Sequence, residues 1–400
     1  MLEPEASVSR RLLVIGANEY VLRSAQGLPL EIVLLTSVDR LDRAASALAS
    51  VSVIGKSLND PAIVRIASQL HGHEPFDGLV SFTEDGLEIA AMIRERLGLH
   101  GTPPLVTAVL RDKGRMREIL GDSPLSAQWR LIQDAEDAEC FLSELDGPAV
   151  IKPLRGSGSK AVVAVDQSNS ETQIANILAT ANGPVLMEER VFGRELSIET
   201  MSYAGSHHVL LVVDKDMGDS FRPKGHVAPA ELDDEARCRV TTAVCDFLDL
   251  VGLRDGPAHT EVVLTDTGVK VIESHDRPAG GWVTELIRLC TGIDMYEVAL
   301  AAASGLVRWP RRGVSEQAHV GALVYFGAEP GVIESISGVG DALSDQHVHG
   351  VLFDKDVGDI HMNLEDEERV GGVLASGSTS SEARNTALAA VQRLRVHVRD

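Results

Sequence analysis

One stretch in the second half of the chain constrains the fold most, because it combines a hairpin signal with two acidic residues. The apolar runs Val262–Leu264 and Val269–Ile272 flank the polar sequence Thr-Asp-Thr-Gly. β-Branched runs around a short turn that ends in glycine are typical of a β-hairpin. A turn centred on Asp266–Thr267 places Glu261 and Glu273 opposite each other or one residue out of register, with Cβ atoms ~5 Å apart when directly opposed. Such carboxylates repel unless a cation lies between them, and a hard divalent cation suits that gap.

An arginine behind the second carboxylate extends this set. Arg277 follows Glu273 by four residues, and the pair Gly280–Gly281 comes next. A guanidinium offers paired donors that match phosphate or carboxylate oxygens. The two glycines let the backbone approach a substrate, or form a simple turn. Two carboxylates and an arginine together are suited to handling phosphate.

Composition limits the class of protein and its partners. A chain of 400 residues is expected to form two or three domains, and its formal net charge is −22. Such a surface repels nucleic acid and anionic membranes, so an anionic substrate requires a local cationic pocket. The four cysteines have no CxxC spacing, which argues against a zinc site or a disulfide framework. Because no apolar run reaches ~18 residues, we expect a cytoplasmic protein that does not span a membrane.

The first 105 residues predict a Rossmann-like parallel α/β layer, since short apolar strands alternate with helices. The strands are expected at Arg11–Gly16, Glu31–Thr36, Val51–Ile54 and Gly78–Ser81. The turn after the first strand reads Gly-Ala-Asn instead of GxGxxG, so we predict no dinucleotide site there. Glu84 follows the fourth strand, where α/β sheets tend to place ligand residues, and is therefore a candidate substrate contact.

A glycine-rich loop between two β-branched runs is a candidate phosphate site. It reads Arg-Gly-Ser-Gly-Ser-Lys over residues 155–160, and its amides and hydroxyls can surround phosphate oxygens. It is not a P-loop, and alone it also fits an ordinary hairpin turn. Lys152 on the preceding strand favours the phosphate interpretation, because a cation there suits the α- and β-phosphates of a nucleotide. Upstream, a helix carrying Arg111, Asp112 and Lys113 is expected from about Thr107.

Two further charged segments are candidates for ligand contacts. A strand that ends at Glu188 and Glu189 can hydrogen-bond adenine through a free backbone edge, and Glu195 can accept from ribose hydroxyls; a solvated charged turn is the alternative. The segment Asp214–Pro229 is expected to be a polar loop. It contains His226, which can bind a substrate carboxylate, although an exposed basic loop is also often simply solvated.

Taken in chain order, these segments resemble the ATP-grasp superfamily, and within it the carboxylate–amine ligases. The resemblance rests on Arg-Asp-Lys-Gly-Arg-Met-Arg (111–117), Val-Ile-Lys-Pro with Gly-Ser-Gly-Ser, Glu-Glu-Arg-Val-x-Gly-x-Glu-x-Ser (188–197), and His-Thr-Glu followed by Ile-Glu-Ser-x-x-Arg. It covers nearly the whole chain. His-Thr-Glu and the C-terminal Glu-Pro-Gly (329–331) are similar to bacterial L-amino acid ligases that make dipeptides. The resemblance implies ATP-driven amide formation through an acyl phosphate, releasing ADP and phosphate.

The same resemblance implies a role for each candidate residue. ATP would contact Lys113, Lys152, Gly156, Ser157, Gly158, Ser159, Glu188, Glu189, Val191 and Glu195. Mg²⁺, or Mn²⁺ in its place, would be held by Glu261 and Glu273. The catalytic set would be Arg277, Lys152, Ser157 and Ser159. The substrates, a carboxylic acid and an amine with an amino acid as at least one of them, would contact Glu84, His226, His259, Arg277, Gly280 and Gly281.

The chain departs from the family pattern at His275, where many ATP-grasp enzymes have an Asn that binds the metal. A neutral imidazole is a softer ligand than Mg²⁺ prefers. His275 is therefore expected either to bind metal or to face the substrate.

The resemblance also implies a multidomain α/β and α+β architecture. A pre-ATP-grasp domain (1–105) is followed by an ATP-grasp domain (106–310) with a lid at about 120–190, and by a C-terminal α+β domain (311–400) whose last helix is capped at Ser380–Ser381. A purine-pathway or carboxylase-type ATP-grasp enzyme and a non-catalytic nucleotide-binding regulator remain alternatives. A homodimer is the default expectation, because two-fold dimers are common.

Overall fold

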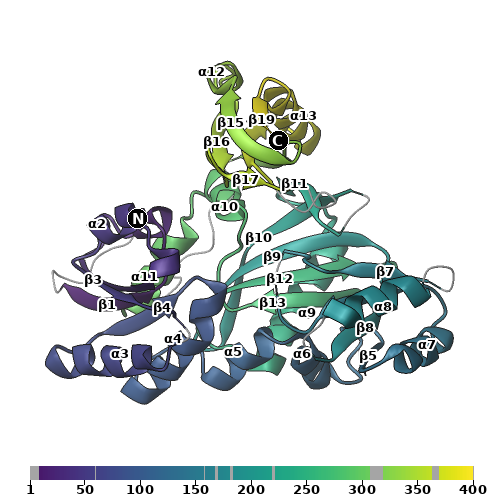
Figure 1. The fold of residues 1–400 in the computed structure, drawn as a ribbon, viewed down its shortest axis with the longest axis horizontal. Helices are drawn as coiled ribbons and strands as arrows, with labels where there is room; N and C mark the ends of the chain where they lie inside the picture. The colour runs from purple at the N-terminus through teal and green to yellow at the C-terminus, as the bar shows by residue number, and fades with distance from the viewer. Residues whose placement is uncertain are drawn as a thin grey trace.

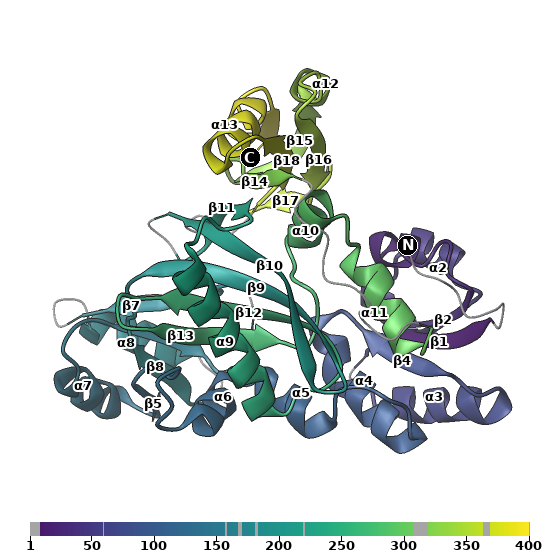
Figure 2. The same cartoon turned by 180° about the vertical axis from the view of Figure 1, so that it is seen from behind.

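The computed structural model describes residues 9–58, 60–156, 158–166, 170–180, 183–218, 221–306, 319–362 and 369–399. Within these ranges the chain forms four β-sheets with helices packed around them (Figure 1). The N-terminal layer lies on one side, two antiparallel sheets lie on the other, and the C-terminal part stands above both, as the reverse view also shows (Figure 2). No helix among the described residues is long and apolar enough to cross a membrane.

The N-terminal layer is a four-stranded parallel sheet in the order β3-β2-β1-β4. Its strands are β1 (Arg10–Ile15), β2 (Leu30–Ser37), β3 (Val51–Gly55) and β4 (Gly78–Ser81). Its helices are α1 (Glu19–Arg23), η1 (Val38–Arg40), α2 (Arg43–Leu48), α3 (Ala62–His73) and α4 (Glu84–Leu97). β1 and β2 are largely buried, as expected for parallel strands covered by helices. The predicted N-terminal parallel α/β layer is confirmed.

The large sheet has eight strands in the order β13-β12-β9-β10-β11-β14-β18-β16, and all its neighbouring strands run antiparallel. These strands are β9 (Arg194–Tyr203), β10 (Ser206–Met217), β11 (Pro223–Ala228), β12 (Gly256–Leu264), β13 (Val269–His275), β14 (Val320–Phe326), β16 (Val348–Phe353) and β18 (Gly371–Gly377). The sheet therefore combines strands from the middle of the chain with strands that follow residue 319.

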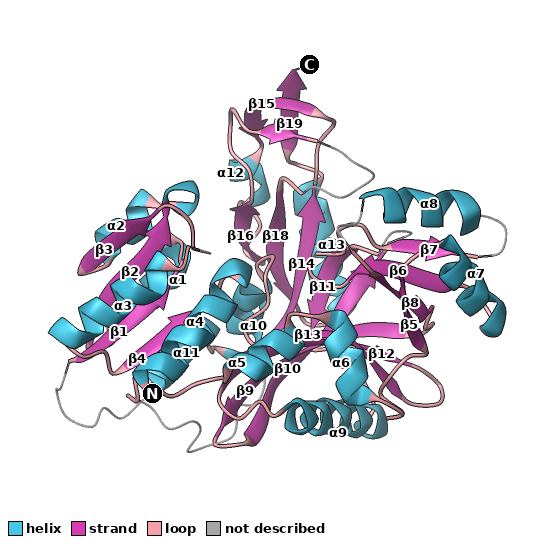
Figure 3. Cartoon of the chain, turned by 60° about the horizontal axis from the view of Figure 1, so that its bottom comes forward, coloured by secondary structure: helices cyan, strands magenta, loops and turns pink. Residues whose placement is uncertain are grey.

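Helices cover one face of the large sheet and leave the opposite face to line a cleft. Figure 3 shows α9 (Asp234–Val251) lying along the sheet. Val240 and Phe247 of α9 share a core with Val262 of β12 and Val271 of β13, all essentially inaccessible to solvent. The helices α5 (Pro104–Leu110) and α6 (Lys113–Leu120) contribute to the same core. Because strand side chains alternate between faces, polar residues at the intervening positions point to the other side.

A smaller antiparallel sheet faces the large one and has the strand order β5-β8-β6-β7. Its strands are β5 (Trp129–Ile132), β6 (Ala149–Pro153), β7 (Val163–Val165) and β8 (Val185–Glu189). The helices α7 (Ala135–Glu144) and α8 (Ser170–Thr180) share its core.

The C-terminal part joins the large sheet and also forms a small sheet of its own. Its remaining elements are β15 (Gly331–Ser337), α12 (Val339–Ala342), β17 (Ile360–His361), α13 (Ser380–Val391) and β19 (Arg395–Arg399). One apolar core runs from Leu12 of β1 through Leu286 of α10 (Val283–Thr291) and Leu300 of α11 (Met295–Ala303) to Leu323 of β14. The N-terminal and C-terminal parts are thus packed together through α10 and α11.

Three local expectations need correction. The helix expected from Thr107 is interrupted at Arg111–Asp112, because the Asp112 side chain accepts from the amides of residues 114 and 115 and so starts α6. Most of the expected loop Asp214–Pro229 belongs to β10 and β11, whose polar residues alternate because one face lines the site. The last helix is capped by Thr379, not by Ser380–Ser381.

Candidate functional site

A cleft between the small and large sheets contains most of the candidate residues. Its charged part is lined by Lys113, Lys152, Arg155, Lys160, Glu188, Glu189, Arg190, Glu195, Lys215, Glu261 and Glu273. Its apolar part is lined by Val150, Val162, Val191, Phe192, Met217, Phe221, Val263 and Ile272. The cleft therefore suits a ligand with a flat apolar group and a strongly charged tail.

A row of charged residues crosses the open face of the large sheet. Glu261 on β12 lies directly opposite Glu273 on β13, which confirms the facing carboxylates predicted from the hairpin. Two strands further on, Lys215 of β10 lies opposite His226 of β11. The Lys215 ammonium donates to Glu261 at 2.7 Å, which joins the two pairs into one row.

Each of the two facing carboxylates is held by a different lysine. The Lys215 Nζ atom lies 2.7 Å from Glu261 and 3.2 Å from Glu195, and the Lys113 Nζ atom lies 2.8 Å from Glu273. Burial alone would raise the pKa of both facing carboxyls. The ammonium groups of Lys215 and Lys113 outweigh that effect and hold the pKa of Glu261 and of Glu273 well below the usual range. Both carboxylates are therefore ionised at neutral pH.

The chemistry of this pair fits a hard divalent cation. Mg²⁺ is commonly held by one or two carboxylates together with substrate phosphates, and seldom by a cage made of protein alone. Among the described residues, no group of three His, Cys, Asp or Glu side chains is arranged to hold a metal. Glu261 and Glu273 would thus supply the protein ligands, and a bound polyanion the others. His275 lies next to the pair, with Nε2 3.5 Å from Glu273.

Lys152 belongs to a buried ion-pair network beside the glycine loop. Its Nζ atom lies 2.6 Å from one oxygen of Glu188, and Arg117 donates to the other oxygen at 2.6 Å. Burial favours the neutral form of Glu188, but Arg117 and Lys152 hold its pKa at about 2. Burial lowers the pKa of Lys152, although Glu188 opposes this. Glu188 lines the cleft as expected, yet its carboxylate is already bound to two cations.

The glycine loop extends from the small sheet to the large one. Its backbone has positive φ angles at Gly156 (132°), Gly158 (70°) and Ser159 (58°). Lys113 donates to the carbonyl of Gly156 at 2.8 Å, and the Ser159 hydroxyl donates to the carbonyl of Phe221 at 2.8 Å. Ser157 lies outside the described residues. The described part of the loop thus connects Lys113 with the turn between β10 and β11.

The segment after β8 borders the apolar part of the cleft. β8 is an interior strand, and the amides of Glu189 and Arg190 each donate to a carbonyl of the small-sheet region at 2.9 Å. The amides of Glu189 and Arg190 are therefore already occupied, so a backbone contact to adenine from this strand end has to use other groups. Val191, just beyond the strand end, lines the cleft, as does Glu195.

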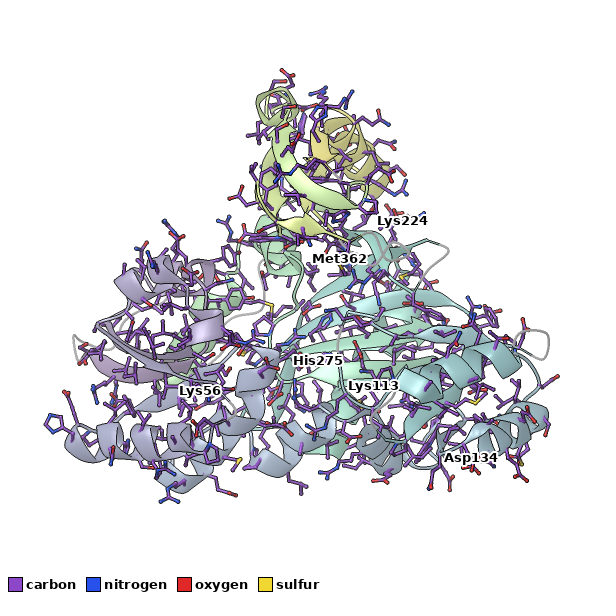
Figure 4. The ribbon with its side chains drawn as sticks, viewed as in Figure 1. Lys56, Lys113, Asp134, Lys224, His275 and Met362 are labelled. Atoms are coloured by element: carbon purple, nitrogen blue, oxygen red, sulfur yellow. The ribbon has the colours of Figure 1, made fainter. Side chains whose placement is uncertain are left out.

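Glu84 links the N-terminal layer to the β12–β13 hairpin. It begins α4, and its carboxylate accepts from Arg111 and from Arg277 Nε, the latter at 2.5 Å. His275 Nδ1 lies 3.2 Å away. Burial alone would raise the pKa of Glu84, but His275, Arg277 and Arg111 hold it well below the usual range. Figure 4 places His275 with Lys113 in the middle of the molecule, where the layers meet.

Lys215 of the row and Glu199 beside it were not among the site residues predicted from the sequence. Glu199 accepts from Ser197 at 3.1 Å and lies 2.7 Å from His259 Nδ1. Burial opposes the charged form of His259, but Glu199 and Glu261 raise its pKa to about 10. His259 is therefore an imidazolium at neutral pH. The alternation of polar residues from Glu195 to Glu199 was the available signal for this row.

The remaining predicted substrate residues meet the C-terminal part. His226 is buried and makes an edge-to-face contact with Tyr325, with ring centroids 5.7 Å apart. Burial and the charge of Arg369 lower the pKa of His226 well below its ordinary value. Gly281, with φ of 61°, accepts from the Tyr325 hydroxyl at 2.5 Å, and Gly280 adjoins open space. His226 and Gly281 thus lie on either side of one tyrosine.

Comparison with known proteins gives three family matches in chain order. Residues 22–101 match the ATP-grasp N-terminal domain, residues 145–285 match the ATP-grasp domain, and residues 324–399 match the L-amino acid ligase C-terminal domain 2. The matches fall on the N-terminal layer, on the two sheets that enclose the cleft, and on the C-terminal part.

Curated relatives match about half of the chain. Alanine–anticapsin ligase of Bacillus subtilis (strain 168) is 26% identical over 246 residues, which cover 54% of this chain and 52% of that protein. Phosphoribosylamine–glycine ligase of Methanothermobacter thermautotrophicus is 29% identical over 220 residues, which cover 52% and 49%. The matched region thus spans about half the length of each relative.

A solved structure extends the likeness to the whole fold. The L-amino acid ligase from Bacillus licheniformis has a TM-score of 0.86 over 99% of this chain and 100% of that one, at 24% sequence identity. The order of matched domains and the fold confirm the resemblance inferred from the sequence. The chain therefore matches two ATP-grasp domain models followed by an L-amino acid ligase domain model, and its fold is similar to that of an L-amino acid ligase.

Proposed function

We propose that the protein is an ATP-dependent carboxylate–amine ligase that forms an amide or peptide bond, with an amino acid as at least one substrate. The observation that carries this proposal is the facing pair Glu261 and Glu273, each beside a lysine in a cleft between two antiparallel sheets. Ionised carboxylates alternating with lysines suit a nucleoside triphosphate that carries a divalent cation. The two curated relatives described above are named as ligases of an amino acid, alanine in one case and glycine in the other.

ATP would lie in the cleft with its base in the apolar part, near Val191, and its phosphates in the charged part. Lys113 and Lys152 would neutralise the α- and β-phosphates, and Ser157, Ser159 and the amides of Gly156 and Gly158 would cover the γ-phosphate. Glu189 and Glu195 border the same cleft, and Glu188 would hold Lys152 in place. Because Lys113 is bound to Glu273, a triphosphate would compete for this lysine, and the carboxylate would then be available to hold a cation.

Mg²⁺, or Mn²⁺ in its place, would be held by Glu261 and Glu273, with His275 as a further candidate ligand. When bound, the cation neutralises charge on the transferring phosphate. Lys215 adds a fixed positive charge from the protein. Burial alone would lower its pKa, but Glu261 and Glu195 raise the pKa above the ordinary value, so the ammonium stays charged.

The reaction would take two steps. The carboxylate of the first substrate attacks the γ-phosphorus, the bond to the β-phosphate oxygen breaks, and ADP leaves. The amine then attacks the acyl carbon, phosphate leaves, and the nitrogen gives up a proton. Arg277, held by Glu84, would donate to the oxyanion that forms on the acyl carbon. Closure of the glycine loop would exclude water from the acyl phosphate.

The two substrates would occupy the region between Arg277 and the C-terminal part. Their contacts would come from Glu84, His226, His259, Arg277, Gly280 and Gly281.

The proposed domain limits are 1–105, 106–310 with the lid at about 120–190, and 311–400. In support, the small sheet runs from Trp129 to Glu189, inside the proposed lid.

The test is an ADP- and phosphate-release screen with Mg-ATP and amino acids supplied singly and in pairs. Release that requires two substrates, with a new amide detected by mass spectrometry, supports the ligase. Nucleotide binding without turnover on any carboxylate contradicts it. A purine-pathway ligase is the second candidate, since one relative is named phosphoribosylamine–glycine ligase; glycine turnover that depends on phosphoribosylamine would identify it.

A further inference from the structure

Several cations along the charged row have carboxylate partners, and Arg369 of the C-terminal part differs from them. Ion pairs of 4.0 Å or less involve Lys113, Lys152, Lys215, Arg111, Arg117, Arg277 and His259. Across the described ranges, no ion pair of this kind involves Arg369, which precedes β18. The chain has a net charge of −22, and the nearby Asp354 interacts with Arg369 only through its charge, without an ion pair in the described structure, so this guanidinium next to the site calls for an explanation.

Arg369 lies at the end of the charged row. Its guanidinium carbon is 3.4 Å from the centre of the Tyr325 ring, and its Nη2 atom donates to the carbonyl of Pro223 at 2.9 Å. Tyr325 in turn contacts His226 and donates to the carbonyl of Gly281. A Cβ atom built on Gly281 would lie 3.2 Å from Arg369 Nη1. The guanidinium is therefore beside the exposed turn Gly280–Gly281.

Among the described residues, fewer donors of Arg369 than of Arg277 have a hydrogen-bond or ion-pair partner. Arg277 directs Nε and Nη2 at Glu84 and Nη1 at the carbonyl of Pro278. An arginine has five N–H donors in a planar fork that matches a carboxylate, and one of those of Arg369 donates to the backbone carbonyl of Pro223. Nearby, the Nδ1 atom of His226 is buried without a hydrogen-bond partner in the described structure.

We propose that Arg369, with His226 and the Gly280–Gly281 turn, binds the carboxylate of the amino acid that supplies the amine. This inference rests on the proposed ligase function. In such a reaction two carboxylates are present, and only one must reach the γ-phosphate. Arg369 is separated from Glu261 by the row positions of Lys215 and His226. A carboxylate held at Arg369 is therefore kept from phosphorylation while the amine end of the same molecule points toward the acyl group.

The test compares amino acids with their amides as the substrate that supplies the amine, using amino acids that have no carboxylate in the side chain. Relative to the wild type, Arg369→Ala should raise the KM of an amino acid acceptor by about 10- to 100-fold, the usual effect of losing a charged hydrogen bond. The KM of the matching amino acid amide and the KM of ATP should stay within about twofold, well below that effect. Arg393→Ala, which removes a guanidinium bound to the carbonyl of Asp341 in the same part of the chain, should change neither KM.

Arg369→Gln is the second variant, because it keeps much of the side chain if the alanine variant is poorly folded. Equal changes for acid and amide acceptors, or no change for either, overturn the inference. Calorimetric titration of amino acids and their amides into the protein separates this result from the ligase proposal, since it needs no turnover. Acid-selective binding that is lost in both variants supports the subsite even if no ligase activity is found; equal binding of acid and amide by the wild type contradicts it.

Discussion

Glu261 and Glu273 face each other across β12 and β13, yet each carboxylate is bound by a lysine from a different part of the chain. Lys215, the partner of Glu261, comes from the same sheet and is buried. Lys113, the partner of Glu273, begins α6 and also donates to Gly156 of the glycine loop. The lysine that binds Glu273 therefore also binds the glycine loop, whereas the lysine that binds Glu261 belongs to the same sheet as its partner.

Replacing Glu273 tests the metal assignment most directly. Glu273→Gln keeps the shape of the side chain but removes the charge that a divalent cation needs. We expect kcat/KM for ligation to fall by about 100-fold or more, comparable with the loss of one strong electrostatic contact in a transition state. Activity that survives within about tenfold of the wild type would show that the metal assignment is wrong.

The matched control for this variant is Asp266→Asn, because Asp266 is an exposed acid at the tip of the same hairpin. It should leave both turnover and thermal stability unchanged. Turnover of the wild type should also stop when a chelator removes divalent cations and return when Mg²⁺ or Mn²⁺ is restored.

Lys215 is predicted to contribute to turnover through its charge. Lys215→Met leaves Glu261 and Glu195 without their shared cation and removes a positive charge from the phosphate end of the cleft. We expect kcat to fall by about 10²–10³-fold, as for other preorganised electrostatic groups. Lys224→Met changes an exposed lysine of the neighbouring strand β11 and should have little effect. Steady-state kinetics decide the matter: equal effects of the two variants would rule out a specific role for Lys215.

The strands of the β12–β13 hairpin and of the N-terminal layer could be predicted from the sequence, because both segments have clear periodicity and turn signals. The length of the hairpin placed Glu261 and Glu273 opposite each other or one residue out of register, and the irregularity between Glu261 and Val262 makes them direct partners. His226 was expected as a substrate contact, but its place in one row with Lys215 could not be predicted, since both occur in a polar segment that looks like a loop until its pairing with β9 and β14 is known. Their burial depends on strands remote in sequence.

The ion pairs of the site also could not be predicted from the sequence. Glu188 lies next to Glu189, and nothing in the local pattern distinguishes a buried carboxylate bound to Arg117 from a half-buried one. The two differ because alternate residues of β8 point to opposite faces, and only one face meets α6. Glu84 and Arg277 are 193 residues apart, so their contact depends on how the N-terminal layer packs on the hairpin.

Glu188 should stabilise the fold in a pH-dependent way. Its pKa is about 2 in the folded protein, against 4.5 for the free group, so its ionised form stabilises the fold by about 3 kcal/mol above pH 4.5. This contribution decreases as the pH falls from 4.5 toward 2, where the folded group becomes protonated. Glu188→Gln should therefore be less stable than the wild type at pH 7, and the difference should shrink in acid.

Urea unfolding at a series of pH values measures this difference. Glu144→Gln is the control, because Glu144 makes an exposed ion pair with Arg130 in the same region and should have little effect on stability. A difference between wild type and Glu188→Gln that stays constant from pH 7 to pH 3 would contradict the linkage to this carboxylate.

Glu84 is predicted to act by positioning Arg277. Its carboxylate accepts from Arg277 and Arg111 and lies beside His275, so Glu84→Gln leaves the two arginines less well held. We expect kcat to fall by about 10- to 100-fold, because a displaced guanidinium stabilises the developing oxyanion poorly. The KM of ATP should stay within about twofold, since the carboxylate does not line the nucleotide cleft. Asp85→Asn, which alters the adjacent exposed acid paired with Arg40, should retain full activity. A rise in the KM of ATP, with kcat unchanged, would instead place Glu84 in nucleotide binding and contradict the positioning role.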